Sequence, residues 1–221
     1  THPSFDIQIR GLCRRFGRRW ALSHVDVDLP AGSGTRVVGP NGSGKSTLLG
    51  CLATALKPHA GSILVGGEHL WEHRDALRPH VGYLAHQHHL WGDLSARENL
   101  TLWGQLGGYT VDTHALLERV GLSPHRTGPV SEYSAGMRRR LALARILIKQ
   151  PKLLLLDEPF AALDPEGRSL VLEVVGEMRE AGSTVVIATH LPDVAAPLAD
   201  RVVHMDRGYR VPADSHLEGE P

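Results

Sequence analysis

The sequence has little of several features that would assign a class at once. Its 221 residues include only two cysteines, Cys13 and Cys51, so we expect two reduced thiols rather than a disulfide or a metal site. The 24 basic residues are balanced by 24 acidic residues, and a net charge of zero gives no electrostatic reason to expect nucleic-acid binding. Apolar runs stay far below the roughly 20 residues that span a bilayer, and we expect no signal peptide. If the protein works at a membrane, we expect another chain to hold it there.

The chain is long enough for one domain, and its first part predicts β-strands. With 42% hydrophobic residues it can bury a sizeable core, so we expect a single domain over residues 1–221. Apolar and polar residues alternate over residues 5–9 and 23–29, which is typical of half-buried antiparallel strands. The basic loop expected between them carries Phe16 and Trp20. These aromatics either stack on a base or pack at the edge of the core, and the residues alone favour neither.

A glycine-rich stretch from Gly39 to Thr47 fits the phosphate-binding pattern G-x-x-x-x-G-K-[ST], with a predicted strand before it and a predicted helix from Leu48 to Leu56 after it. Its glycines let main-chain N–H groups approach an oxyanion, and the helix points its positive end at the same place. Lys45 is expected to reach the β- and γ-phosphates of a nucleotide, and Ser46 to give its hydroxyl to Mg²⁺. The predicted nucleotide contacts in this stretch are Asn41, Gly42, Ser43, Gly44, Lys45, Ser46 and Thr47. A plain turn is the alternative, and a match of this length between a strand and a helix argues against it.

An acidic pair follows the run Leu153–Leu156, which is typical of a parallel strand buried on both faces. In a chain with a phosphate-binding loop, Asp157 is expected to hold Mg²⁺ through water, and Glu158 to act as the general base that activates the attacking water. The alternative, two charges that only end a strand, would leave the apolar run and the phosphate-binding loop unconnected. Asp164, followed by a proline, is expected to cap the next helix.

Two further polar residues follow predicted strands. Gln87 follows the strand predicted at 81–85, where open α/β sheets place ligands, and is a candidate contact to Mg²⁺ or to the attacking water. His190 follows the strand predicted at 184–188 and is a candidate contact to a γ-phosphate, although a lone histidine is more often structural. The histidines at positions 86, 88 and 89 are expected to be solvated, because the chain shows no Cys/His spacing pattern for a metal.

Over residues 90–145 the sequence pattern predicts helices and loops instead of strands. Ser95 begins a capping-box pattern, and Ser134-Ala135-Gly136 opens the last of these helices. Small residues at a helix N-terminus are a weak signal for a second phosphate cradle. Arg138–Arg140 are interpreted as a solvated or subdomain-packing face. After Pro212 the composition predicts disorder.

The ordered set of motifs resembles the nucleotide-binding subunit of ABC transporters, over nearly the whole chain. The matching motifs are the A-loop aromatic (Phe16), Walker A (Gly39–Thr47), the Q-loop (Gln87), the signature motif (Tyr133–Met137), Walker B with its glutamate (Leu153–Glu158), the D-loop (Ala161–Asp164) and the H-loop histidine (His190). The resemblance implies an α/β fold: a P-loop NTPase (RecA-like) core with an N-terminal antiparallel β subdomain and an α-helical insert subdomain at about 90–145.

The resemblance also implies how these residues work. Two chains, identical or paralogous, would sandwich two ATP-Mg²⁺ molecules head to tail, each between Walker A of one chain and Ser134 and Gly136 of the other. The implied roles are catalysis for Glu158, His190 and Gln87, Mg²⁺ binding for Ser46, Gln87 and Asp157, and a dimer contact for Asp164. The chain would lie peripherally on the cytoplasmic face of the cell membrane, bound to integral membrane subunits that carry the cargo.

The signature motif departs from the usual Leu-Ser-Gly-Gly-Gln, because this chain has Tyr-Ser-Ala-Gly-Met. Ser134 and Gly136 keep the hydroxyl and the close backbone approach, so we expect the phosphate cradle to survive. Such variants resemble exporter subunits, and residues 83–87, 98–100 and 134–136 resemble the ATPase of the haem exporter used in cytochrome c maturation. The alternatives are an importer ATPase and a non-transport ABC ATPase of DNA repair or translation. Against the non-transport class, the chain shows one cassette, no long coiled coil between the Walker motifs and zero net charge.

Overall fold

The strands form two sheets of different kinds in the computed structural model, which describes residues 5–87 and 89–212. One described sheet is antiparallel and four-stranded, in the order β2-β1-β4-β5. The other is six-stranded, in the order β10-β9-β3-β8-β7-β6, and its pairs are parallel except for β9 with β10. The strands are β1 Ile7–Phe16, β2 Arg19–Leu29, β3 Gly34–Val38, β4 Ala60–Val65, β5 Glu68–His69, β6 Val81–Leu84, β7 Leu153–Asp157, β8 Thr184–Ala188, β9 Arg201–Asp206 and β10 Tyr209–Val211.

The burial pattern of each strand matches its position in its sheet. Every residue of β7 and β8 is buried, as expected for central strands of a parallel sheet that is covered on both faces. In β1, Ile7 and Ile9 are buried whereas Gln8 and Arg10 are exposed, which is the alternation of a sheet with one wet face. The predicted basic loop between the first two strands is wrong, because the strands continue through it and meet at a tight hairpin in which Gly17 has φ +57°. Alternation did not reveal the extension, since most of its residues are exposed.

Helices and short 3₁₀ turns connect the strands. The α-helices are α1 Lys45–Leu52, α2 Arg74–Leu77, α3 Ala96–Gly107, α4 Thr113–Arg119, α5 Ala135–Leu147, α6 Pro165–Glu180 and α7 Pro192–Ala195, and the 3₁₀ turns are η1 Arg78–His80, η2 Val130–Glu132 and η3 Ala196–Leu198. The capping box predicted at Ser95 is confirmed, with Ser95 and Glu98 satisfying each other's backbone N–H groups. The predicted end of α1 is wrong by four residues: the helix stops at Leu52, because the chain turns through a left-handed Thr54 with φ +57°.

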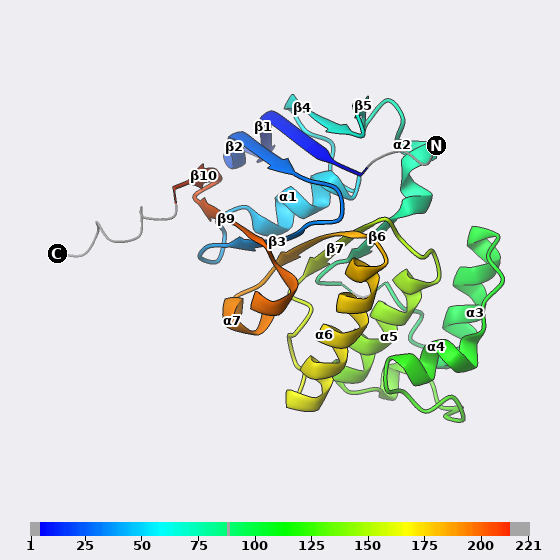
Figure 1. Cartoon of the computed structure of the whole chain (residues 1–221). Helices are drawn as coiled ribbons and strands as arrows, with labels where there is room; N and C mark the ends of the chain where they lie inside the picture. Colours follow the sequence, from blue (N-terminus) through cyan, green and yellow to red (C-terminus); the bar gives the residue numbers. More distant parts are fainter. Residues whose placement is uncertain (1–4, 88, 213–221) are drawn as a thin grey trace.

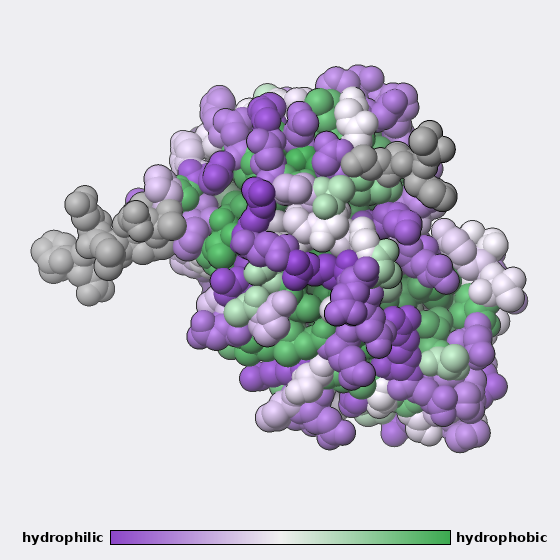
Figure 2. Space-filling view, in the orientation of Figure 1, coloured by the Kyte–Doolittle hydropathy of each residue, from purple (hydrophilic) through white to green (hydrophobic). Residues whose placement is uncertain are grey.

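The elements are arranged in layers around the parallel sheet. Helix α1 lies between the antiparallel sheet and one face of the parallel sheet, and α5 and α6 cover the other face (Figure 1). Successive leucines of β7 point to opposite sides: Leu153 and Leu155 belong to the hydrophobic cluster under α1, and Leu154 and Leu156 to the cluster under α3–α6. Hydrophilic residues cover most of the face in Figure 2, with apolar residues visible in patches between the lower helices.

The predicted fold class is confirmed: an α/β protein with a parallel core sheet, an N-terminal antiparallel sheet and a helical segment between β6 and β7. Helices α3, α4 and most of α5 lie within residues 90–145. One cluster of buried side chains joins these helices to the parallel sheet, so their treatment as a separate subdomain stays a prediction. Among residues 5–87 and 89–212, no helix has both the length and the apolar character that crossing a membrane requires. The disorder predicted after Pro212 lies outside the described residues, as does the histidine at position 88.

Candidate nucleotide-binding site

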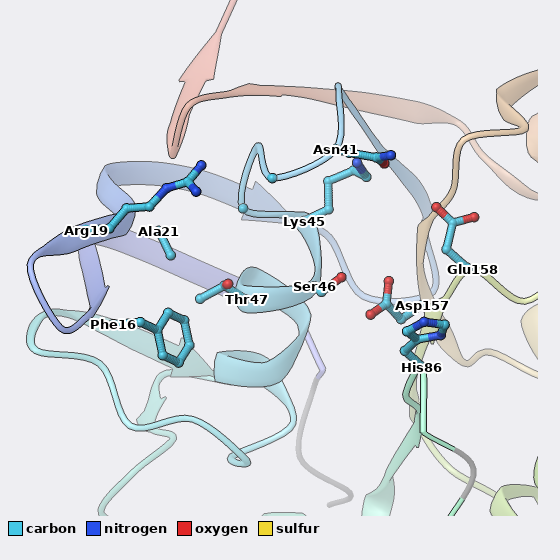
Figure 3. Close-up of a pocket in the computed structure, with 12 residues that line it drawn as sticks. Phe16, Arg19, Ala21, Asn41, Lys45, Ser46, Thr47, His86, Asp157 and Glu158 are labelled. Carbon is cyan, nitrogen blue, oxygen red and sulfur yellow. The ribbon is translucent and has the colours of Figure 1, made fainter.

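A cavity of about 520 Å³ lies where the carboxyl ends of the parallel strands meet the hairpin of the antiparallel sheet (Figure 3). Its lining comes from the β1–β2 hairpin, the loop between β3 and α1, the start of α1, the loop after β6 and the end of β7. The lining residues are Phe16, Arg19, Ala21, Asn41, Gly42, Gly44, Lys45, Ser46, Thr47, His86, Asp157 and Glu158. The structure therefore brings together the A-loop aromatic, most of Walker A and both Walker B carboxylates, which the sequence spreads over more than 140 residues.

Glycine is required at two points of the phosphate-binding loop. Gly39 has φ +148°, and a Cβ there would lie 2.0 Å from the carbonyl oxygen of Met205. Gly44, the N-cap of α1, has φ +108°, and a Cβ there would lie 2.5 Å from the carbonyl oxygen of Ala21. Both positions combine a left-handed backbone with a backbone neighbour that cannot move aside. The loop is therefore a fixed cradle at the N-terminus of α1, which suits a phosphate.

Lys45 is the buried cation of this cradle. Its side chain is largely enclosed, and its Nζ donates to the carbonyl oxygens of Gly39 at 2.7 Å and Pro40 at 3.0 Å. Burial lowers the pKa of the Lys45 ammonium, against the charges of Glu158 and Asp157, which raise it. An ammonium that has lost part of its hydration gains more from an anion than one in open solvent.

Ser46 and Asp157 place two oxygen ligands side by side. Asp157 ends β7, is 3% exposed and accepts a hydrogen bond from the Ser46 side chain, and Figure 3 shows the two groups pointing toward one another. Burial raises the pKa of Asp157, and the bond from Ser46 lowers it in part. A hydroxyl and a buried carboxylate at the mouth of a phosphate cradle are hard oxygen donors of the kind that Mg²⁺ prefers. These residues therefore fit the metal that the motifs imply.

Glu158 is held at the cavity by His190. The ring Nδ1 of His190 lies 2.7 Å from Glu158 Oε2, and the backbone N–H of His190 donates to the same oxygen at 3.2 Å. Glu158 itself has φ +52°, and its N–H donates to the carbonyl oxygen of Ala188 at 2.8 Å. A left-handed backbone at a glutamate is uncommon and costs free energy, and such residues gather at functional sites. The predicted general base and the predicted switch histidine thus form one unit.

Phe16 lies on the wall of the cavity and is half-exposed. The Arg14 guanidinium lies 4.9 Å from the centre of its ring. Trp20, the other aromatic of the hairpin, is also half-exposed, so neither of them is packed into the core edge. Phe16 has the position that base stacking requires, and that role stays a prediction.

Six predicted site residues do not line this cavity. Ser43 is buried within the phosphate-binding loop, and His190 lies outside the lining, hydrogen-bonded to Glu158. Ser134 is exposed at the N-terminus of α5, where its Oγ accepts a hydrogen bond from Met137 N at 3.1 Å. Asp164 is exposed at the N-terminus of α6 and caps it through Gly167 N at 2.8 Å. Gly136 sits close to the loop before α6, since a Cβ there would lie 2.9 Å from the carbonyl oxygen of Ala162. Gln87 is exposed beside the site.

The structure adds residues that the sequence reasoning missed. Arg19 and Ala21 line the cavity from β2, and the Arg19 Nη2 lies 3.4 Å from the point where a Gly42 Cβ would stand. His86, predicted to be only solvated, lies beside Asp157 in Figure 3 and lowers the pKa of that carboxyl. Arg139, interpreted as a solvated or packing residue, is 3% exposed. The available signals were the basic hairpin and the adjacency of His86 to Gln87.

Comparison with known proteins identifies the family to which this chain belongs. The profile described as "ABC transporter" matches residues 22–161, which is more than half of the 221 residues. The chain belongs to the ABC transporter family. It carries the ATP-binding domain of that family, whose ligands are ATP and Mg²⁺.

Relatives of this family align along most of the chain. DrrA3, a daunorubicin resistance ATP-binding protein of Streptomyces coeruleorubidus, is 40% identical over 207 residues, which are 91% of this chain and 66% of DrrA3. LolD, a lipoprotein-releasing system ATP-binding protein of Shewanella sp. strain MR-7, is 36% identical over 208 residues, which are 89% of this chain and 90% of LolD. The chain thus spans about two thirds of the length of DrrA3.

The fold has close counterparts among solved structures. The dimeric ATP-binding cassette MJ0796, in a post-hydrolysis state bound to ADP and Pi, superposes with a TM-score of 0.82 over 93% of this chain and 97% of that chain. At 24% sequence identity this similarity shows the ABC ATPase fold.

Proposed function

We propose that the chain hydrolyses ATP with Mg²⁺ as one half of a head-to-tail dimer and drives export through separate membrane subunits. The carrying observation is the single cavity that joins the Lys45 cradle, the Ser46–Asp157 pair and Glu158, to which His190 is hydrogen-bonded. A site for hydrolysis needs these parts within reach of one phosphate chain. In the described residues these parts lie together, although they come from three separate segments of the sequence.

Each residue then has a role that its geometry supports. The P-loop N–H groups and Lys45 bind the β- and γ-phosphates. Thr47 lies on the Phe16 side of Ser46 in Figure 3 and is proposed to lie near the α-phosphate. Ser46 and Asp157 hold Mg²⁺, which neutralises charge on the phosphate oxygens when bound. Glu158 accepts a proton from water, and the His190 Nδ1–H fixes the direction of the accepting carboxylate. Gln87 is proposed to touch Mg²⁺ or that water.

The exposed helix ends support the dimer part of the proposal. Ser134 and Gly136 stand at the N-terminus of α5, which is a positive helix end that does not line the chain's own cavity. A second copy or a paralogous chain is the proposed source of the ATP that they contact. Asp164, at the neighbouring end of α6, is proposed as a dimer contact.

The direction of transport and the cargo are proposals that go beyond the family. Export is supported by the signature variant Ser134-Ala135-Gly136-Met137 and by the similarity to DrrA3, a drug resistance protein. A haem cargo rests on the three short resemblances around residues 83–87, 98–100 and 134–136 alone, and the names of DrrA3 and LolD do not support it. We propose that the chain works peripherally on the cytoplasmic face of the membrane.

A pull-down tests this function. Tagged Glu158→Gln protein is loaded with ATP-Mg²⁺, membranes are extracted in mild detergent, and the proteins that come with it are identified. We expect a polytopic membrane protein, and haem-handling proteins beside it only if the narrower proposal is right. Tagged Lys45→Ala protein, which we expect to lose ATP, is the control. Recovery of ribosomes, DNA or soluble partners alone would overturn the transport proposal and leave the ATPase chemistry standing.

A further inference from the structure

Three consecutive arginines on α5 make three different connections. Arg138 donates to the carbonyl of Tyr133, just before its own helix. Arg140 donates from Nη1 to the carbonyl oxygen of Gly121, at the end of α4, at 2.9 Å. Arg139 donates from Nη1 to the carbonyl oxygen of Ala85 at 3.1 Å. Ala85 follows β6 directly, so the middle arginine alone connects the signature helix to the segment that begins the Q-loop.

Arg139 is also the buried member of the three. It is 3% exposed, whereas Arg138 and Arg140 are partly exposed. Within the described part of the chain its Nε has no hydrogen-bond partner. A buried guanidinium with an unpartnered N–H costs free energy unless opposite charge lies near.

The opposite charge comes from the Walker B pair. Burial lowers the pKa of Arg139, and the charges of Asp157 and Glu158 raise it. In return, the charge of Arg139 lowers the pKa of Asp157. The guanidinium therefore lies within electrostatic reach of both carboxylates while it is tethered to Ala85. The hydrogen bond of Arg139 thus joins α5 to the strand end at Ala85, and its charge acts on the acidic end of β7.

We propose that Arg139 is a positioning residue that sets the place of the Q-loop start relative to the signature helix. The proposal rests on the ATPase function proposed above. Ser134 lies five residues before Arg139, and Gln87 lies two residues after Ala85. Both of these predicted ATP contacts therefore belong to segments that the Arg139 side chain joins to each other through its hydrogen bond to Ala85.

Because of its position, Arg139 should affect the rate of hydrolysis and not the affinity for ATP. Arg139 does not line the nucleotide cavity, so ATP affinity does not depend on a contact from it. Its loss leaves the Ala85 carbonyl without this donor and removes a cation from beside the acidic pair. Because a misplacement of about 1 Å can cost about 10²-fold in rate, we expect Arg139→Met to lower kcat by about 10- to 100-fold and to change KM for ATP by less than about threefold.

Arg139→Met, Arg139→Lys and Arg140→Met are compared in two measurements. The first is steady-state ATP hydrolysis, in which Arg139→Lys should recover most of kcat and Arg140→Met should resemble the wild type. The second is amide hydrogen exchange of residues 81–87 in nucleotide-free protein. Exchange there should be faster in Arg139→Met and unchanged in Arg140→Met, because Arg140 contacts Gly121 instead. If Arg139→Met does not fold, Arg139→Gln, which keeps an N–H donor without the charge, takes its place.

Several results would overturn the proposal: a raised KM with unchanged kcat, no recovery in Arg139→Lys, or equal effects of Arg139→Met and Arg140→Met. Unchanged exchange over residues 81–87 in Arg139→Met would also overturn it. A wild-type chain that does not hydrolyse ATP would count against the proposed function instead, and the exchange experiment would still decide the role of Arg139.

Discussion

The residues that the motifs assign to ATP occupy two regions of different physical character. In the cavity, Lys45 and Asp157 are buried and already held by hydrogen bonds to groups of their own chain. At the ends of α5 and α6, Ser134 and Asp164 are exposed, and their side chains cap helices. The cavity is thus organised by one chain alone. The positive N-termini of α5 and α6 are exposed to solvent. They need a second chain if they are to contact a nucleotide or form an interface.

This difference separates two kinds of mutation. Changes in the cavity should act on a single chain, on nucleotide binding or on the chemical step. Changes at the helix ends should leave single-chain binding intact and act only when two chains meet. The predictions below test that separation, beginning with the largest expected effect.

Lys45→Ala should abolish most ATP binding by the isolated chain. A hydrogen bond to a charged group is worth about 1.5–3 kcal/mol, which corresponds to about 10- to 100-fold in Kd. Titration calorimetry with ATP-Mg²⁺ measures this change. Glu158→Gln is the matched control: it should keep the Kd and lower hydrolysis by at least about 10²-fold, the usual worth of a general base. Near-normal hydrolysis by Glu158→Gln would remove Glu158 from the catalytic role.

Ser134→Arg should block ATP-induced dimerisation and spare ATP binding. The new side chain would stand at the N-terminus of α5, outside the cavity that holds the nucleotide. Light scattering in a Glu158→Gln background measures the dimer with and without ATP, and we expect at least about a tenfold loss of dimer affinity, or about 1.4 kcal/mol. Ser123→Arg, at another exposed serine, should dimerise normally. A loss of single-chain ATP binding in Ser134→Arg would contradict the separation of the two regions.

Arg19→Ala should weaken ATP binding slightly, because Arg19 lines the cavity next to Gly42 from an exposed hairpin. Exposed charge pairs are worth about 0.2–1 kcal/mol, so we expect a Kd raised about two- to fivefold, and less at high salt. Arg18→Ala is the control, since Arg18 carries the same charge one residue away and does not line the cavity. Equal effects of the two changes would mean that only the net charge of the hairpin matters.

The two regions also differ in how much of them the sequence could predict. Some features depend only on residues that are adjacent in the sequence, and the structure contains all of them. They are the strand Leu153–Asp157, the P-loop and the helix caps at Ser134 and Asp164. These features depend on local backbone and burial rules, which a single segment satisfies by itself.

The missed features depend on contacts between distant segments. Arg19 reaches the P-loop only because β1 and β2 continue into their hairpin, and Arg139 is buried only because α5 packs beside the end of β6. His86 lies near Asp157 because β6 pairs in parallel with β7, and the sequence alone does not distinguish it from the other histidines. Nothing in the local pattern of an arginine or a histidine distinguishes these positions from solvent-facing ones.

Asp157→Asn should abolish Mg²⁺-dependent hydrolysis and yet stabilise the nucleotide-free chain. Burial raises the folded-state pKa of Asp157 above the ordinary 3.8, so the folded protein holds this proton more tightly than the unfolded chain does. The stability from that protonated form is present below pH 3.8 and is lost as the pH rises through the folded-state pKa. At pH 7.5 the ionised carboxylate therefore costs stability, which asparagine avoids.

The measurement is the Tm of nucleotide-free protein, with Asp164→Asn as the partner experiment from the exposed region. For a chain of this size a gain of about 1 kcal/mol raises Tm by about 2–4 °C, so we expect Asp157→Asn to gain that much at pH 7.5 and less as the pH falls toward 3.8. Asp164→Asn should leave Tm unchanged, since aspartate and asparagine cap helices about equally well. A lower Tm for Asp157→Asn at pH 7.5 would show that the hydrogen bond from Ser46 outweighs the cost of burying the charge. In that case the Asp157 carboxylate would stabilise the nucleotide-free cavity. That result would contradict our expectation that the chain keeps this carboxylate for the metal at a cost in stability.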